Sequence, residues 1–263
     1  MAIKKIIVVY APPTGNEQKN TISTVNKTLK KHGIRFGACH RDKLNKKMFS
    51  GIDLAIAVGG DGTFLRTSHF ILDKTPVFGV NSDSKFKEGF FMSSSRKDFG
   101  KKFARILSGK YKTRKLSRLE ARIGKKKVPE LALNEFYLSS KKEYRTARYY
   151  ITVKGKRERQ KSSGLLISTA AGSYAWMKSA GGKTLPLESE NFEYLVRESY
   201  CGKVSAKCSL TKGILSKKDK VEVEFELGDG ILIADSLGKE HILRAGQKVS
   251  VNVSKNPLNS VVF

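Results

Sequence analysis

The strongest constraint on the fold is an alternation of short apolar runs with helical patterns over roughly the first 108 residues. Apolar runs predict buried strands at 6–10, 34–39, 54–58 and 77–81. Helical spacing of apolar residues predicts helices at 21–31, 63–72 and 96–107. Strands that alternate with helices are typical of βαβ units, which form a parallel sheet. We therefore expect an α/β domain over residues 1–110.

The second half of the chain has a different texture, rich in β-strand patterns. Strands are predicted at 131–139, 148–153 and 165–168, and the segment 221–253 alternates apolar and polar residues between short turns. That alternation predicts an antiparallel meander with one buried face. We expect a β-rich domain over 111–245 and a C-terminal segment, 246–263, that returns to the first domain.

The charge balance is strongly basic, with 51 Lys and Arg against 24 Asp and Glu, a formal net charge of +27. Such a chain attracts phosphates through simple electrostatics, whether on a nucleotide, a nucleic acid or a membrane surface. No basic run is interleaved with aromatic residues as single-strand binders require. We therefore expect no nucleic-acid binding beyond non-specific electrostatics.

The remaining composition excludes several classes of protein. A hydrophobic content of 39% is enough to build a core, which excludes a fully disordered chain. No apolar stretch approaches the ~18 residues of a membrane span, and the N-terminal apolar run fits a first strand better than a signal peptide. The three cysteines, Cys39, Cys201 and Cys208, lack metal-ligand spacing and argue against a disulfide framework. They fit a reducing cytoplasm, with Cys201 and Cys208 expected to be packing residues.

The segment 57–63, Ala-Val-Gly-Gly-Asp-Gly-Thr, carries the clearest chemistry. It lies where a predicted strand ends and a helix begins, so its glycines let backbone N–H groups approach a phosphate at the helix N-terminus. Asp61 then places a carboxylate beside bound phosphates, where it can accept a proton from an attacking hydroxyl or help to hold Mg²⁺. A tight turn with Asp61 as a helix cap would use the same residues. The spacing matches neither a Walker A loop nor a dinucleotide-binding fingerprint.

Three motifs together resemble those of a known family. Residues 59–67, GGDGTFLRT, resemble a motif shared by NAD kinases, diacylglycerol and sphingosine kinases and 6-phosphofructokinases. Residues 132–135, Ala-Leu-Asn-Glu, resemble the Asn-Glu motif of NAD kinases, and 164–182 resemble their second glycine-rich motif. The segments 79–83 and 88–91 are similar to the mitochondrial-type branch. The resemblance extends over about residues 5–250.

The resemblance implies a two-domain architecture, a Rossmann-like α/β domain followed by a β-rich domain, with the site in a cleft between them. It implies ATP-dependent phosphorylation of the adenosine-ribose 2′-hydroxyl of NAD to give NADP, with Mg²⁺ on the donor phosphates. It also implies a homodimer or homotetramer. The phosphoryl donor, ATP or polyphosphate, and the choice between NAD and NADH stay open, and no metal-ligand cluster is visible in the sequence.

The resemblance also implies a role for each matching residue. Asp61 would be the general base. The phosphate-binding turn would comprise Gly59, Gly60, Gly62 and Thr63, and Arg66, one helical turn on, is a candidate to neutralise phosphate charge. Contacts to NAD would come from Asn134, Glu135, Phe90, Phe91, Ala175 and Ser179. Because adjacent strand residues face opposite ways, only one of the two phenylalanines need lie in the site.

Two positions depart from the family pattern. Ser163 stands where many NAD kinases have an aspartate, and the bulky Tyr174 replaces a threonine. Both positions belong to the predicted NAD-binding set, so the departures bear on substrate preference and on activity. Two alternatives therefore stay open: a lipid kinase of the diacylglycerol or sphingosine type, and a non-catalytic NAD(P)-binding sensor.

Overall fold

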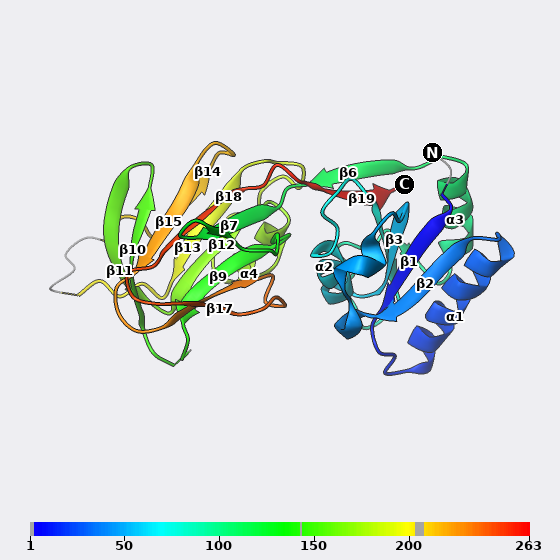
Figure 1. Ribbon diagram of the computed structural model, residues 1–263, viewed down its shortest axis with the longest axis horizontal. Coiled ribbons are helices and arrows are strands. Elements are labelled where there is room, and N and C mark those ends of the chain that lie inside the picture. The colour runs from blue at the N-terminus through cyan, green and yellow to red at the C-terminus, as the bar shows by residue number, and fades with distance from the viewer. Residues whose placement is uncertain (1–2, 143, 203–207) are drawn as a thin grey trace. The chain divides into compact units, whose positions relative to one another are not determined.

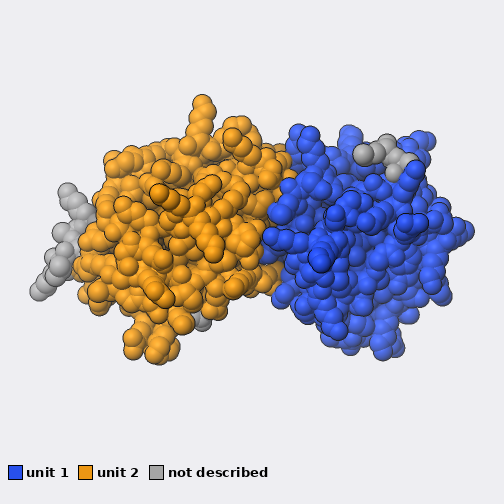
Figure 2. Space-filling view, in the orientation of Figure 1, with its two compact units in different colours: residues 1–115, 258–263 blue, residues 116–257 orange. Residues whose placement is uncertain are grey.

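The computed structural model describes residues 3–142, 144–202 and 208–263. The chain forms two compact units, which Figure 2 distinguishes by colour. Unit 1 comprises Met1–Lys115 and Leu258–Phe263, and unit 2 comprises Leu116–Pro257.

Unit 1 is built on a sheet with the strand order β2-β1-β3-β4-β19-β6, to which β5 adds beside β4 (Figure 1). The strands are β1 Lys5–Tyr10, β2 Arg35–His40, β3 Leu54–Gly59, β4 Val77–Asn81, β5 Ser94–Ser95, β6 Lys112–Leu116 and β19 Leu258–Val262. Strands β2, β1, β3 and β4 pair in parallel, and β19 continues the parallel arrangement beside β4. The parallel α/β sheet predicted from the alternating pattern is confirmed.

Three helices accompany this sheet: α1 Asn16–Lys31, α2 Asp61–Ser68 and α3 Phe99–Leu107, with short 3-10 helices η1 Arg41–Lys43 and η2 Lys46–Phe49. The buried faces of α1 and α3 pack on alternate residues of β1, β3 and β4 to form one hydrophobic core. Helix α1 begins five residues before the predicted start, after an extended Gly15, and α2 ends earlier, at Ser68. Among the described residues, no helix is both long enough and apolar enough to cross a membrane.

Unit 2 is a sandwich of two antiparallel sheets with strand orders β11-β10-β15-β18-β7-β8 and β14-β13-β12-β9-β16-β17 (Figure 1). The first sheet contains β7 Leu119–Ile123, β8 Lys126–Lys127, β10 Ala147–Val153, β11 Lys156–Ser162, β15 Lys220–Phe225 and β18 Lys248–Val253. The second contains β9 Glu135–Ser140, β12 Gly164–Ser168, β13 Phe192–Arg197, β14 Lys212–Leu215, β16 Gly230–Ala234 and β17 His241–Leu243. Their inward-facing residues form one shared core.

The predicted meander over 221–253 is wrong in its pairing. Strand β15 pairs with β10 and β18 in one sheet, whereas β16 pairs with β9 and β17 in the other. Period-2 alternation reports which face of a strand is buried and carries no information on its partner, and both sheets bury a face against the same core. Strand β18 accordingly stays in unit 2, and only β19 joins the sheet of unit 1.

The cysteine prediction also needs correction, because Cys201 and Cys208 form a disulfide bond. The two residues lie seven positions apart, after β13 and before β14, and their Cα atoms are 5.9 Å apart, within the range that a disulfide spans. Cysteine count and spacing alone do not reveal this pairing. Cys39, on β2, is a free thiol.

The core of unit 1 yields a prediction about stability. Phe99 is fully buried and stacks on Phe78 and Phe103 at centroid distances of 5.8 and 5.6 Å. Because truncation removes apolar burial and leaves a cavity, Phe99→Ala should lower the free energy of unfolding by about 3–5 kcal/mol. Phe86, which is 86% exposed, provides the control, and Phe86→Ala should change stability by less than about 0.5 kcal/mol. Urea denaturation followed by circular dichroism measures both, and equal effects would contradict the packing argument.

Candidate functional site

The turn from β3 into α2 has no room for side chains at its first glycine. A Cβ on Gly59 would collide with the Thr63 side chain, and one on Gly60 would lie 3.2 Å from the Lys87 side chain. The helix therefore begins directly at the strand end, with Gly60 extended and its carbonyl accepting from the Thr63 N–H at 2.8 Å. This geometry leaves the first N–H groups of α2 at the carboxyl edge of the parallel sheet, where a phosphate is well accommodated.

Asp61, the first residue of α2, is only partly buried, and its position is fixed by one backbone bond. Its Oδ1 accepts from the Phe91 N–H at 2.9 Å. Phe91 is itself buried and stacks on Phe64 of α2 at 5.0 Å, whereas the adjacent Phe90 is 42% exposed. Phe91 is thus a packing residue that orients Asp61, and of the two predicted phenylalanines Phe90 has the more exposed ring.

Two arginines lie beside this turn. Arg66 of α2 pairs with Asp42 through a 3.3 Å contact, so the candidate drawn from the sequence has a carboxylate partner. Arg41, in η1 after β2, donates from Nη1 to the Thr63 hydroxyl at 3.4 Å, and its Nη1 lies 3.8 Å from where a Cβ on Gly62 would stand. Among the described residues, the buried Nε atoms of both arginines have no hydrogen-bond partner. The Arg41 Nε also lies 3.9 Å from the Asp42 carboxylate, so the two arginines share this partner. The candidate donors to an anionic ligand are therefore their remaining guanidinium N–H groups.

Lys87 adds a third cation, and the loop after β4 holds it in place. Its ammonium donates to the Ser82 hydroxyl at 2.8 Å, and its backbone carbonyl accepts from the Asn81 amide at 3.0 Å. Burial lowers the pKa of Lys87, Asp83 opposes that change, and the positive charge of Arg41 lowers the pKa further. The Arg41 charge therefore reaches Lys87, so the two cations act on the same region of unit 1.

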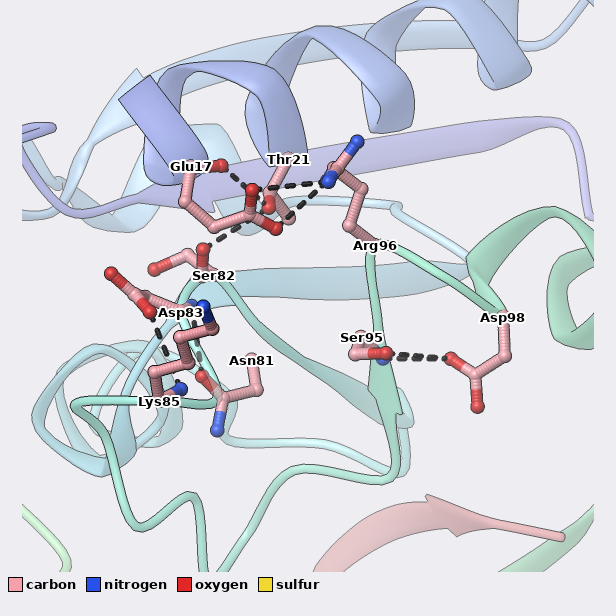
Figure 3. Close-up of polar contacts among 9 residues, drawn as sticks. All are labelled: Glu17, Thr21, Asn81, Ser82, Asp83, Lys85, Ser95, Arg96 and Asp98. Atoms are coloured by element: carbon pink, nitrogen blue, oxygen red, sulfur yellow. Dashed lines mark hydrogen bonds and ion pairs between the residues drawn. The ribbon is translucent and has the colours of Figure 1, made fainter. Parts of the chain in front are cut away.

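A polar network anchors this loop to α1 and to the segment before α3 (Figure 3). The Thr21 hydroxyl donates to the Ser82 carbonyl at 3.1 Å, and Arg96 binds Glu17 through contacts of 2.8 and 3.1 Å. At the far side, the Asp98 carboxylate accepts from the Ser95 N–H at 2.8 Å. The loop that carries Lys87 and Phe91 is thus tied down at both ends.

In unit 2, Asn134 and Glu135 form the entry to β9, and both are buried. The Asp235 carboxylate, at the end of β16, accepts from the N–H groups of Asn134 and Glu135 at 2.6 and 3.1 Å. The Glu135 pKa is raised to about 8, first by burial and second by the Asp235 charge. Among the described residues, Asn134 Oδ1 and Glu135 Oε2 are buried without a hydrogen-bond partner. Such atoms need a ligand or a solvent molecule to satisfy them.

The second glycine-rich motif binds the other side of the segment that enters β9. The Thr169 hydroxyl donates to the Leu133 carbonyl at 2.6 Å, and the Thr169 N–H donates to the Asn134 carbonyl at 2.8 Å. A Cβ on Gly172 would collide with that same Asn134 carbonyl, so only glycine fits there. The two motifs that the sequence separates are therefore one packed structure.

The remaining predicted residues of unit 2 fall into two groups. Tyr174 is 40% exposed, and Ala175 and Ser179 lie on the accessible side of the short 3-10 helix η3 Gly172–Tyr174 and helix α4 Trp176–Ser179. Ser163 instead uses its backbone: its carbonyl accepts from the Tyr137 hydroxyl at 3.0 Å, and its N–H donates to the Arg197 carbonyl at 3.1 Å. Ser163 thus links β12 to its neighbours.

Sequence reasoning missed Arg41, Lys87 and Asp235. Arg41 lies in the short 3-10 helix η1 and Lys87 lies in the loop after β4, and the proximity of Arg41 to the turn follows from the pairing of β2 beside β1. Asp235 lies 101 positions from Asn134, at the end of a predicted strand, and its only signal in the sequence is an acidic residue that interrupts an apolar run. Three His, Cys, Asp or Glu side chains placed to hold a metal ion are not found in the described ranges.

Comparisons with known proteins agree with these features. Residues 4–111 match the family model described as the ATP-NAD kinase N-terminal domain. The chain is 26% identical to a probable NADH kinase of Oryza sativa subsp. japonica over 93% of this chain and 81% of the relative. It is 28% identical to an NADH kinase of Arabidopsis thaliana over 96% of this chain and 86% of the relative.

Solved structures show the same fold. An NAD kinase from Archaeoglobus fulgidus in complex with ATP aligns with a TM-score of 0.79 at 21% identity, covering 98% of this chain and 93% of that one. A yeast NADH kinase complexed with NADH aligns with a TM-score of 0.82 at 16% identity, covering 100% of this chain and 84% of that one. Residues 4–111, with the glycine turn that opens α2 at Asp61, thus match the ATP-NAD kinase N-terminal domain, and over nearly its whole length the chain is similar to NAD and NADH kinases.

Proposed function

We propose that this protein is an NAD kinase that transfers a phosphoryl group from ATP to the 2′-hydroxyl of the adenosine ribose of NAD, giving NADP. The observation that carries the proposal is Asp61, whose carboxylate begins α2 beside the phosphate-binding turn and is oriented by the Phe91 N–H at 2.9 Å. A carboxylate at that position is suited to accept the hydroxyl proton while the new bond to phosphorus forms.

Positioning and charge neutralisation account for most of the catalysis in phosphoryl transfer. In unit 1 we assign these tasks to the N–H groups of Gly60 and Gly62 and to the side chains of Arg41 and Lys87. Thr63 shapes the phosphate-binding turn, since its own N–H donates to the Gly60 carbonyl at 2.8 Å. Arg66, which pairs with Asp42, makes a smaller contribution through its remaining donors. Gly59 contributes by its lack of a side chain, which lets α2 approach the strand end.

We also propose how Mg²⁺ and ATP bind. The described residues include no set of three His, Cys, Asp or Glu side chains placed to hold a metal ion. Mg²⁺ is commonly held largely by substrate phosphates and water, so we infer that it enters with ATP. When bound, it neutralises charge on the donor phosphates, and the protein's own task is to hold those phosphates in line with the acceptor.

In unit 2 we assign dinucleotide binding to Asn134 and Glu135. Among the described residues, the buried Asn134 Oδ1 and Glu135 Oε2 atoms have no hydrogen-bond partner. Exposed Phe90, in unit 1, provides an aromatic surface for the adenine. Ala175 and Ser179 are assigned to the nicotinamide half of the dinucleotide, with Tyr174 narrowing the space beside them. Ser163, in place of the family's aspartate, removes a charge from this region.

NADH is a second candidate acceptor. Two of the relatives, from Oryza sativa subsp. japonica and Arabidopsis thaliana, carry the name NADH kinase, and the neutral Ser163 favours a neutral nicotinamide ring over a cationic one. A direct comparison of kcat/KM for NAD and NADH distinguishes the two acceptors.

The cytoplasmic location and the homodimeric or homotetrameric state remain part of this proposal. Light scattering coupled to size-exclusion chromatography measures the oligomeric state. Because disulfide bonds are uncommon in reducing compartments, mass spectrometry of thiol-blocked peptides from the host cell tests the location through the redox state of Cys201 and Cys208.

The first functional prediction concerns Asp61. With NAD, ATP and Mg²⁺, Asp61→Asn should lower kcat by about 10²–10⁴-fold with little change in KM for NAD, because general-base catalysis is lost. The asparagine side-chain oxygen still accepts from the Phe91 N–H, so the fold is retained. NADP formation in a coupled assay measures the effect.

A matched control is Asp53→Asn, since Asp53 likewise accepts backbone N–H groups, those of Lys4 and Lys5 at 2.8 Å. Its kcat should stay near that of the wild-type chain. Unchanged turnover in Asp61→Asn would contradict the base assignment. Dinucleotide binding without turnover in the wild-type chain would favour a sensor, and liposome binding without NAD affinity would favour a lipid kinase.

A further prediction concerns Arg41. Arg41→Gln should raise KM for ATP roughly 10- to 100-fold, the effect of losing a hydrogen bond to a charged group worth about 1.5–3 kcal/mol. Arg41→Lys keeps the charge and should recover part of the loss. The control is Arg157→Gln on β11, where the guanidinium pairs with Glu224 at 3.2 Å. Steady-state kinetics at varied ATP measure all three, and equal KM values for ATP in Arg41→Gln and wild type would refute the assignment.

A further inference from the structure

Asp235 is buried, 3% exposed, and its carboxylate binds a run of three consecutive backbone N–H groups. Oδ2 accepts from Leu133 at 2.9 Å, and Oδ1 accepts from Asn134 and Glu135 at 2.6 and 3.1 Å. In return, the Asp235 N–H donates to the Glu135 carbonyl at 2.8 Å. One side chain from the end of β16 therefore fixes the backbone direction of the whole segment that enters β9.

The backbone of this residue is itself in an uncommon conformation. Asp235 and the following Ser236 have φ values of +51° and +53°, in the left-handed region that non-glycine residues seldom adopt. Such a conformation persists only where surrounding contacts over-determine it. Here the four hydrogen bonds between Asp235 and the 133–135 segment do so, and they turn the chain so that the carboxylate points back at that segment.

Two side chains of the 133–135 segment carry polar atoms without a partner among the described residues. Among the described residues, Asn134 Oδ1 and Glu135 Oε2 are buried and make no hydrogen bond. Their backbone, by contrast, is fully engaged, because Thr169 and Ser168 bind the carbonyls of Leu133 and Asn134. The backbone is fixed on both sides while two side chains are left for a ligand.

We propose that Asp235 is a positioning residue for the dinucleotide, holding Asn134 and Glu135 so that Glu135 presents a carboxyl O–H donor to the bound ligand. This proposal rests on the proposed function and deepens it, since it gives the chemistry by which unit 2 recognises an uncharged acceptor atom. The ligand atom is a ribose hydroxyl oxygen or an adenine ring nitrogen, both of which accept a hydrogen bond.

The protonation state of Glu135 follows from its surroundings. Burial, followed by the charge of Asp235, raises its pKa to about 8. Among the described residues, no other ionisable group contributes to this shift, and the residue paired with Glu135 on β12 is the uncharged Ser168. Below about pH 8 the carboxyl is therefore neutral and can donate, whereas above pH 8 it ionises and can only accept.

Four variants test the proposal. Asp235→Asn removes the charge, and Glu135→Gln mimics the neutral carboxyl, keeping a donor at all pH values. The double variant combines them. Glu158→Gln is the matched control, because the Glu158 carboxylate also accepts two backbone N–H groups in unit 2, those of Ser209 and Leu210 at 2.8 and 3.1 Å.

The readouts are KM for NAD and, independently of turnover, NAD titration followed by fluorescence of Trp176, the only tryptophan in the sequence, between pH 6 and 9.5. Trp176 lies beside Ala175, 4.7 Å from the ring of Tyr137. In the wild-type chain, NAD affinity should be constant at low pH and fall about tenfold per pH unit above pH 8, as expected for loss of one proton.

The variants should change this profile in distinct ways. Asp235→Asn should move the inflection to lower pH, because it removes one of the two causes of the raised pKa. Glu135→Gln should abolish the inflection, and adding Asp235→Asn to it should change affinity by the same factor at every pH. Glu158→Gln should leave the inflection near pH 8. A purely structural role for Asp235 would change affinity without moving the inflection.

Two results would overturn the proposal: an inflection that survives in Glu135→Gln, or one that Asp235→Asn leaves in place. Glu135→Gln keeps all three N–H bonds to Asp235, so it tests the proposal even if Asp235→Asn fails to fold. If the wild-type chain forms no NADP but its NAD titration and those of the variants follow the expected pH profiles, the kinase reaction is rejected and the positioning role of Asp235 is supported. An absence of NAD binding at every pH would overturn both.

Discussion

The missing side chain at Gly59 is the steric constraint on which the chemistry of unit 1 depends. It allows Thr63 to pack against the end of β3, so that α2 begins at once and Asp61 stands at its first position. The same turn gives Arg41 its contact with the Thr63 hydroxyl and sets Phe64 against Phe91, whose N–H orients Asp61. One close approach of helix and strand thus arranges Asp61, which we propose as the base, together with a neighbouring cation and the aromatic pair that supports them.

The two carboxyl groups of the proposed site lie in contrasting environments. Asp61 is partly exposed, and its Oδ1 accepts one backbone N–H, that of Phe91. Glu135 is buried next to a second carboxylate, and both causes favour its neutral form. We propose different tasks for the two groups, proton acceptance for Asp61 and ligand binding for Glu135. Asp61 belongs to the glycine turn of unit 1, and Glu135 belongs to the Asn-Glu pair of unit 2.

The fold class and the family were predictable because they depend on local patterns. The apolar run at 77–81 coincides with β4, and the glycine turn at 59–62 combines strand end and helix start in adjacent residues. Long-range pairing was not predictable. Strands β15 and β16 follow one another yet enter different sheets, and the spacing of Cys201 and Cys208 does not by itself reveal their disulfide bond. Within the site, Asp235 was not predictable, because its partners are backbone N–H groups about 100 positions away. Every residue except proline has such a group, so the partner's side chain gives no signal in the sequence.

The arrangement of β6 and β19 makes unit 2 an insertion into unit 1. The chain leaves the first sheet through β6, and the last strand, β19, lies between β4 and β6. A ribosome therefore synthesises every residue of unit 2 before the strand that joins β4 to β6 exists. Unit 2 can complete its own sandwich during translation, whereas the parallel sheet closes only after β19 has been synthesised. The residues of β19 thus complete the domain whose synthesis began first.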